Sequence, residues 1–239
     1  MSVEPAAYSP ATYPAQATPS SPPGRESILS RIRDALRNRG ATQLPQPTPI
    51  TSTIGRAALV QQFAGNARGV EATVQVASTV TEGHAVLRRW LAELQISGFL
   101  YVPSPVLERL GVERIGSSLP IPLDPARADE ARSLLQSSPA GVSEATAALS
   151  NTGTIIEASA PLRSRLISLL PPVHISVVTS ARIFPDLATW LEQAKLPEAF
   201  ETSSAFTLIT GPSRTADIEQ TLTKGVHGPG QVFILVLDE

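Results

Sequence analysis

The chain has 239 residues, of which 42% are hydrophobic, and its formal net charge at pH 7 is -2. With only 19 lysines and arginines, it lacks the basic excess with which nucleic-acid-binding proteins contact phosphate backbones, so we expect no nucleic-acid partner. The sequence contains no cysteine, which excludes disulfides, thiolate catalysis and cysteine-bound zinc or iron-sulfur clusters from this chain. Any redox metal centre would have to belong to a partner.

The first 24 residues are expected to be a disordered tail. They are rich in Pro, Ala, Ser and Thr, a composition that cannot bury enough apolar surface to offset the entropy lost on ordering. They also lack the basic start and apolar core of a secretory signal, and no apolar run in the chain approaches the about 20 residues needed to span a bilayer. We therefore expect a cytoplasmic protein without a membrane span.

Residues 25–40 form the next expected unit, an amphipathic helical arm. The helix is predicted over residues 26–39 and ends before Gly40. Its apolar side chains share one face: Ile28, Leu29, Ile32, Ala35 and Leu36. Residues 41–55 are again rich in proline and are expected to be a linker. The arm must bury its apolar face on its own domain or on another protein chain, and the sequence leaves both alternatives open, together with self-association.

An α/β domain is expected over residues 56–239, because the hydrophobic period switches repeatedly between 2 and 3.6. Strands are predicted at "ATVQVA", "GFLYVP", "GTIIEAS", "HISVVT", "FTLIT" and "QVFILVL". Helices are predicted at "TEGHAVLRRWLAELQ", "PARADEARSLLQ", "FPDLATWLEQA" and "TADIEQTLTK". Strands alternating with helices favour a mostly parallel sheet with helices on both faces.

One stretch, "FTLITGPSRTADIEQTLTKGVHGPG" at residues 206–230, concentrates turn residues and reactive side chains. The pattern predicts a strand, a Gly-Pro turn and a helix that begins at Ser213 or Thr215. Such a loop lies at the carboxyl ends of parallel strands, where amide groups and a helix N-terminus favour anions. The candidate anion-binding residues are Gly211, Pro212, Ser213, Arg214 and Thr215, with Arg214 as a forked cationic donor.

The alternative is that Ser213 and Thr215 only cap this helix while Arg214 pairs with Asp217 or Glu219. The same two acidic residues and His227, which precedes the last strand, are weak candidates for catalysis. His227 is equally suited to shaping its loop through a hydrogen bond.

A second candidate ligand-binding segment is "SNTGTII", residues 150–156. Asn151, Thr152 and Thr154 offer amide and hydroxyl groups around Gly153, which allows a backbone to approach a ligand closely. A tight turn without a ligand explains the same residues.

The remaining histidines suggest structural roles. His174 enters a predicted strand, where a hydrogen-bonded structural role is the more common one, and His84 has no partner at the helical spacing of a metal pair. Glycine-rich dinucleotide motifs, a Walker lysine loop and a nucleophile elbow are absent from the sequence, so no cofactor and no metal is expected.

Several segments together resemble the LUD-domain family, and within it the lactate utilization protein C type. They are "ILSRIRDAL", "GVSEATAALSNTGTIIE", "LISLLPPVHISVV" and "ITGPSRTADIEQTLTKGVHGPGQVFILVL". The resemblance covers residues 25–239 and is strongest from residue 141 onward. It implies a fold similar to the coenzyme A transferase, ribose-5-phosphate isomerase and glucosamine-6-phosphate deaminase superfamily, whose members bind small anions at strand ends.

The resemblance also implies a part in the oxidation of L-lactate to pyruvate, together with iron-sulfur partner proteins and without a cluster in this chain. The alternative is an enzyme or sensor that binds a carboxylate, a phosphate ester or a coenzyme A-type anion. Family members usually carry an acidic residue where this chain has Asn151. If that carboxylate acts in catalysis Asn151 cannot replace it, whereas an asparagine can orient the turn as well.

Overall fold

The computed structural model describes the following residues: 23–37, 54–115, 119–122, 128–159, 164–194, 203, 205–216 and 222–238. The chain divides into two compact units, residues 1–46 and residues 47–239. The predicted tail and linker lie outside the described residues, apart from two residues at the end of each.

The described part of the first unit is helix α1, Pro23–Arg37. It begins three residues before the predicted start and ends two residues before the predicted end, and Ile28, Ile32 and Leu36 are 57%, 50% and 59% exposed on it. Because residues four apart lie on the same side of a helix, these three side chains form one apolar stripe. The described residues therefore form a helix with an exposed apolar stripe, and the role of this helix as a separate arm stays a prediction.

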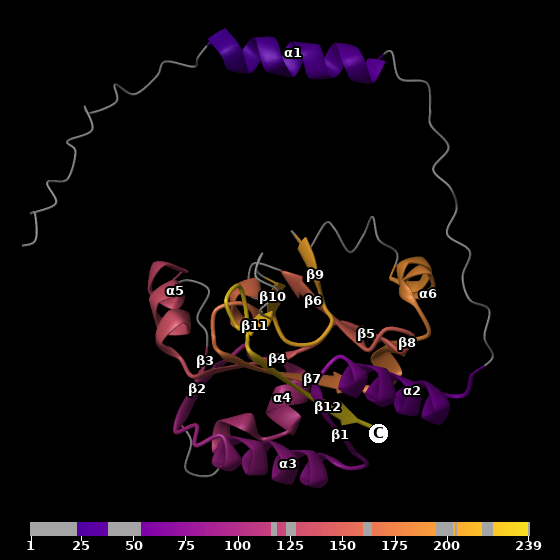
Figure 1. The fold of residues 1–239 in the computed structure, drawn as a ribbon, viewed down its shortest axis with the longest axis vertical. Coiled ribbons are helices and arrows are strands. Elements are labelled where there is room, and N and C mark those ends of the chain that lie inside the picture. The colour runs from indigo at the N-terminus through magenta and orange to yellow at the C-terminus, as the bar shows by residue number, and fades with distance from the viewer. Residues whose placement is uncertain are drawn as a thin grey trace, which may run out of the picture. The chain divides into compact units, whose positions relative to one another are not determined.

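The second unit is built on a six-stranded sheet with the strand order β1-β12-β7-β4-β2-β3 (Figure 1). Its strands are β1 Thr73–Ala77, β2 Gly98–Tyr101, β3 Leu119–Pro122, β4 Ala140–Glu144, β7 Val173–Thr179 and β12 Gln231–Leu237. Every pairing in this sheet is parallel, with Thr73 opposite Phe233 and Phe233 opposite Ile175. The predicted α/β fold class with a mostly parallel sheet is confirmed.

Helices cover both faces of this central sheet. Along β12, Phe233, Leu235 and Leu237 join the core formed by α3, Val80–Glu93, whereas Val232, Ile234 and Val236 join the core formed by α2, Arg56–Gly69. Because successive side chains of a strand point to opposite faces, α2 and α3 lie on opposite sides of the sheet.

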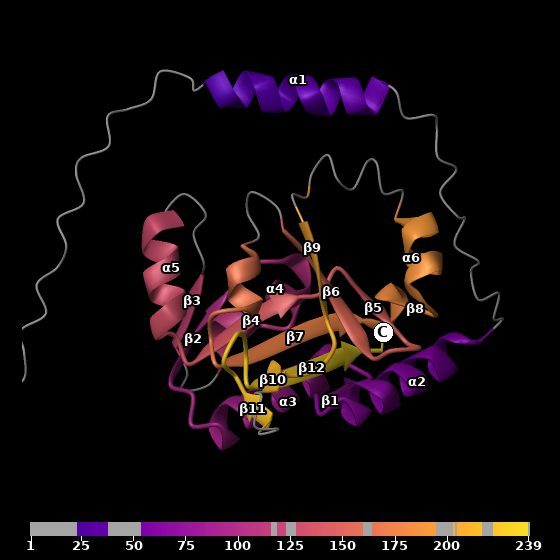
Figure 2. The ribbon, with the colours of Figure 1, turned by 45° about the horizontal axis from the view of Figure 1, so that its top comes forward.

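A smaller sheet of four strands packs on the α2 face. Its order is β8-β5-β6-β9, with β5 Ala147–Leu149, β6 Thr154–Ser159, β8 Ile183–Phe184 and β9 Ala205–Ile209. Its side chains Ala148, Ile155 and Ile183 belong to the same core as Val232 and Ile234. Figure 2 shows these short strands on the opposite side of β7 and β12 from α3. The sequence predicted strands β6 and β9 but not that they leave the parallel sheet.

Polar N-cap residues begin several helices of this unit. Thr79 accepts a hydrogen bond from the amide of Glu82 at the start of α3, and the Glu82 carboxylate accepts one from the amide of Ser78 in return. Asp186 caps α6, Leu187–Gln193, in the same way. Two further helices are α4, Pro105–Arg109, and α5, Ala128–Ser137. No helix among the described residues is both long and apolar enough to cross a bilayer.

The prediction of a helix at "TADIEQTLTK" is wrong. Arg214–Ala216 is strand β10 and Leu222–Lys224 is strand β11, and the two pair antiparallel. The β-branched Thr215 and Thr223 face each other across the pair, as suits strands, and Ser213 anchors the hairpin through backbone hydrogen bonds to Pro229 and Gly225. Asp217 and Glu219, which were expected in the first turns of a helix, lie outside the described residues.

Candidate functional site

The two segments predicted to bind a ligand lie side by side in the structure. The hydroxyl oxygen of Thr154 lies 2.7 Å from that of Thr152 and 2.8 Å from that of Thr210, the residue before Gly211. Asn151, Thr152 and Gly153 form the turn between β5 and β6, as the sequence predicted for a turn that leads into a strand. A row of three hydroxyl groups therefore joins the turn to the end of β9.

The glycines of both segments contact helix α2 instead of leaving room for a ligand. Gly153 has φ 67°, and a Cβ there would lie 2.2 Å from the backbone nitrogen of Ala67. Gly211 has φ 79°, and a Cβ there would lie 2.2 Å from the carbonyl oxygen of Val70. Both positions thus require glycine for conformation and for packing against the C-terminal end of α2.

Arg214 is held by its own chain. Its guanidinium donates a hydrogen bond of 2.8 Å to the carbonyl oxygen of Val70 and lies 3.4 Å from a carboxylate oxygen of Glu71. Lys224 pairs with the other oxygen of Glu71, and this hydrogen bond is the main reason that the pKa of Glu71 lies below its ordinary value. The nearby helix end is the carbonyl end of α2, which favours cations, and not the N-terminus that the sequence suggested.

The other predicted site residues lie in the loop before β12 or in the β10–β11 hairpin and the turn before it. His227 is exposed in the loop between β11 and β12. Pro212 is buried, and Ser213 and Thr215 belong to the β10–β11 hairpin and its anchor. As a ligand site, the segments at 151–154 and 211–215 stay a prediction.

A buried polar cluster that the sequence analysis did not identify lies between the two sheets. It consists of Ser143 on β4, Glu157 on β6, and His174 and Ser176 on β7, and we call it the interior polar cluster. These four residues are 2%, 6%, 0% and 0% exposed. The hydroxyl groups of Ser143 and Ser176 donate to the same carboxylate oxygen of Glu157, at 2.9 Å and 3.1 Å.

The hydrogen bonds assign the tautomer of His174. Nε2 of His174 lies 2.9 Å from the hydroxyl oxygen of Ser143, whose own proton is donated to Glu157, so Nε2 carries the proton and donates to Ser143. Nδ1 is then a buried acceptor, and it has no hydrogen-bond partner among the described residues. Although Glu157 lies 3.7 Å from Nε2, burial dominates and lowers the pKa of His174 from 6.5 to about 4, so the ring is neutral.

The signal for this cluster was present in the sequence. Strand β7 reads "VHISVVT", in which His174 and Ser176 occupy alternate positions of an otherwise apolar strand, and the strand "TIIEAS" carries Glu157 in the same way. Alternate positions face one side of a strand, so polar residues there predict a polar patch on one face. The structural role predicted for His174 considers this residue alone and not its polar neighbours.

A narrow pocket opens beside the interior polar cluster. It is lined by Val102, Ser143, Glu144, Glu157, Ala158, Ser164, Arg165 and Ile167. Its closed part has room for about one water molecule, and its mouth is formed by the half-buried Glu144 and Ser164 and the exposed Arg165. It combines two carboxylates, two hydroxyl groups and one guanidinium at the carboxyl end of β4, a usual position for ligands in parallel sheets.

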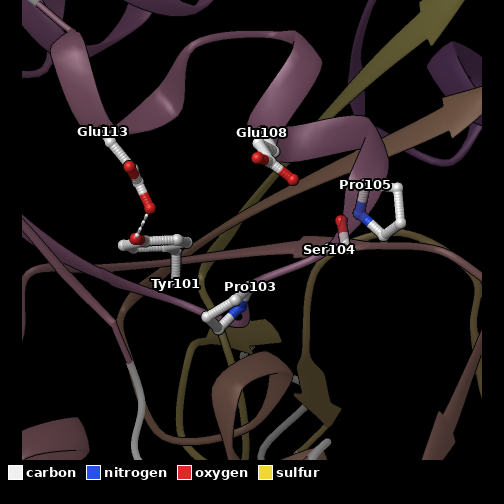
Figure 3. Close-up of a pocket in the computed structure, with 6 residues that line it drawn as sticks. All are labelled: Tyr101, Pro103, Ser104, Pro105, Glu108 and Glu113. Carbon is white, nitrogen blue, oxygen red and sulfur yellow. Dashed lines mark hydrogen bonds between the residues drawn. The ribbon is translucent and has the colours of Figure 1, made fainter.

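A wider cavity of ≈ 280 Å³ lies at the carboxyl end of β2 (Figure 3). The hydroxyl group of Tyr101 donates a 2.9 Å hydrogen bond to Glu113, and Glu108 lies across the cavity from this pair. Burial, and then the bond to Glu113, raises the pKa of Tyr101 to about 12. No group of three or more His, Cys, Asp or Glu residues in the described parts of the chain could hold a metal ion. The charged groups that line the cavity are the two carboxylates of Glu108 and Glu113, without a counter-charge among its lining residues.

Comparison with known proteins identifies the family. The model of the LUD domain matches residues 60–237. The chain belongs to the LUD domain family. The match contains both sheets and the interior polar cluster, and helix α1 precedes it. The predicted family is therefore confirmed.

Curated relatives match this LUD-domain chain over part of its length. An uncharacterized protein of Neisseria meningitidis serogroup B is 39% identical over 98 residues, which cover 41% of this chain and 42% of the relative. Lactate utilization protein C of an Exiguobacterium species is 36% identical over 118 residues, or 48% of this chain and 51% of the relative. The uncharacterized protein YkgG of Escherichia coli is 33% identical over 137 residues, which cover 56% of this chain and 59% of the relative. The matches thus span about half the length of these relatives.

Among solved structures, the LUD-domain chain is similar to the crystal structure of a DUF162 family protein from Deinococcus radiodurans. The TM-score is 0.57 with 20% sequence identity, over 77% of this chain and 99% of the other. At that identity the similarity supports the fold alone.

Proposed function

We propose that this LUD-domain chain is a component of an L-lactate utilization system and acts in the cytoplasm. The observation that carries the proposal is the similarity to proteins named lactate utilization protein C, at 30–36% identity to four of them, together with the LUD-domain match over residues 60–237.

Within such a system, the chain serves as a subunit without a redox centre. Oxidation of L-lactate to pyruvate releases two electrons and two protons, and a chain without cysteine has no thiolate to hold an iron-sulfur cluster. We propose that the electrons pass to partner proteins and that these are iron-sulfur proteins. The exposed apolar stripe of α1 supports association with another chain, because such a stripe gains stability when it is buried.

The test is L-lactate-dependent dye reduction in extracts of a strain that lacks this chain. We expect the activity to be lost on deletion and restored by the purified protein, while NADH-dependent dye reduction in the same extracts stays unchanged. Full L-lactate-dependent activity in the deletion strain would remove the chain from L-lactate oxidation.

A second candidate function is small-anion binding by the segments at 151–154 and 211–215. The observation in its favour is the contact of the two segments through Thr154 and Thr210. On this hypothesis Arg214→Ala weakens the binding of phosphate or a carboxylate, whereas Lys224→Ala, which disturbs the same Glu71 ion pair, does not. Equal anion affinity of wild type and Arg214→Ala would reject it and leave Arg214 with its structural role.

A further inference from the structure

We propose that the pocket between β4, β6 and the short helix at residues 165–168 binds a small hydroxy-carboxylate. Arg165 engages the carboxylate of the ligand, and the acidic wall formed by Glu144 and Glu157 accepts its hydroxyl group. The inference rests on the proposed function, since it names the ligand class that a component of L-lactate utilization would bind.

The interior polar cluster behind this pocket is costly for stability. A carboxylate, an imidazole and two hydroxyl groups occupy buried positions between the two sheets, where aliphatic side chains would pack without giving up hydrogen bonds to water. Nδ1 of His174 is, in addition, a buried acceptor without a partner in the described structure. Buried polar networks fix the geometry of their members, and perturbed groups beside a cleft mark candidate sites.

The cluster positions the Glu157 side chain at the pocket. The hydrogen bonds run in one direction, from His174 to Ser143 and from Ser143 to Glu157, and Ser176 donates to the same oxygen. The carboxylate is therefore fixed by two donors on one oxygen while the residue lines the pocket wall. A fixed carboxylate loses little entropy when it accepts a ligand hydroxyl group.

At the mouth of the pocket, Arg165 supplies the opposite charge. Its side chain is exposed, and in the part of the chain that the structure describes its guanidinium has no carboxylate or carbonyl partner. A guanidinium binds a carboxylate through two parallel hydrogen bonds. Ser164 beside it accepts a hydrogen bond from the amide of Leu166, so the hydroxyl proton of Ser164 remains available for the ligand.

This arrangement selects one ligand class by charge. The single negative charge of a carboxylate meets Arg165, and a neutral hydroxyl group can donate to Glu144 or Glu157. The two carboxylates repel every anion, and they repel a phosphate dianion more strongly than a monoanion because it carries twice the charge. The narrow closed part admits a hydroxyl-sized group, and the long exposed side chain of Arg165 can move to admit the rest of a three-carbon acid.

The experiment is titration of the full chain with L-lactate, propionate and inorganic phosphate, followed by calorimetry or by the NMR signals of the ligands. We expect saturable binding of L-lactate and roughly tenfold weaker binding of propionate, which lacks the hydroxyl group. We expect Arg165→Ala to weaken L-lactate binding by about tenfold or more. The matched control is Arg182→Ala, which removes another exposed arginine from a short helix outside the pocket and should leave the affinity unchanged.

The outcomes separate this inference from the proposed function. No saturable L-lactate binding, equal affinity for propionate, or equal affinity in Arg165→Ala overturns the pocket assignment, even if the chain restores dye reduction in the deletion strain. Ser164→Ala provides a second variant that leaves the buried cluster intact, and it should also weaken L-lactate binding. Binding that depends on Arg165, in a chain whose deletion leaves L-lactate oxidation intact, would support the pocket and reject the proposed function.

Discussion

The hydroxyl oxygens of Thr154 and Thr210 lie 2.8 Å apart, which joins the turn before β6 to the end of β9. Thr154 is 3% exposed and Thr210 is exposed, so the contact links a buried position to the surface. The two residues lie 56 positions apart in the sequence, Thr154 at the start of β6 and Thr210 directly after β9, and these two strands pair antiparallel. The contact therefore helps to fix the small sheet against α2, where Gly153 and Gly211 also pack.

Replacing Thr154 with Val should lower the free energy of unfolding by about 1 kcal/mol. Valine has the same shape and suits a strand, but it removes the hydroxyl group that Thr152 and Thr210 share. Denaturant unfolding measures the change. Thr223→Val, at an exposed position of β11, is the control and should stay within about 0.5 kcal/mol of wild type. Equal stability of the two variants would contradict a stabilising role for the hydroxyl contact.

Replacing two glycines with alanine, one within α2 and one packed against it, should change the stability of the protein in opposite directions. Gly153→Ala should destabilise the protein by roughly 2–4 kcal/mol, because φ 67° strains an alanine and the new Cβ would lie 2.2 Å from Ala67. Gly65→Ala, on the exposed side of α2 with nothing within 4 Å of the new Cβ, should stabilise it by up to about 1 kcal/mol. Thermal unfolding of both variants tests the pair, and a tolerated Gly153→Ala would show that the α2 contact can relax.

The sequence predicts correctly those helices and strands whose apolar residues recur at the spacing of the side that is buried. Strands β1, β7 and β12 and helix α3 follow directly from alternating or helical apolar positions, because each faces a continuous core. The hairpin of β10 and β11 was predicted as a helix, since "TADIEQTL" has helical spacing and only distant contacts reveal its strands. Those contacts are the bond of Arg214 to Val70 and the ion pair of Lys224 with Glu71.

The candidate site was harder to predict than the fold. The interior polar cluster joins Ser143, Glu157 and His174 from three strands in two different sheets, so no local motif contains it. Its local traces are the alternation of polar residues in β7 and the single carboxylate in β6. The predicted turn at 151–154 was correct as a turn, but the role of Gly153 depends on α2, which lies more than 80 residues earlier.

Acid should destabilise the protein through His174. Its pKa is lowered from 6.5 to about 4 in the folded state, so between these values the unfolded chain binds the proton and the folded protein does not. The free energy of unfolding is therefore unaffected by His174 well above pH 6.5, and it falls as the pH decreases toward 4, by up to about 3 kcal/mol. Denaturant unfolding at a series of pH values between 4.5 and 7.5 measures this slope.

Two variants test whether His174 causes the dependence of stability on pH. His174→Gln removes the titrating ring while its amide can still donate toward Ser143, so its stability should depend less steeply on pH. His84→Gln alters a half-buried histidine of α3 that contacts the carbonyl oxygen of Leu110, and it should retain the steep slope of wild type. A slope in His174→Gln as steep as that of wild type would assign the acid sensitivity to other groups.

Association with partner proteins should depend on the apolar stripe of α1. Replacing Ile28, Ile32 and Leu36 with Ala keeps the helix propensity but removes most of the exposed apolar surface of the stripe. If the stripe is buried in a complex with iron-sulfur partners, the triple variant should bind them roughly a hundredfold more weakly, as measured by co-purification and by titration of the isolated proteins. The control replaces Arg33 and Arg37 with Ala, which changes exposed positions of the same helix without touching the stripe. Unchanged co-purification of the triple variant would remove α1 from the interface and favour docking of the stripe on its own chain.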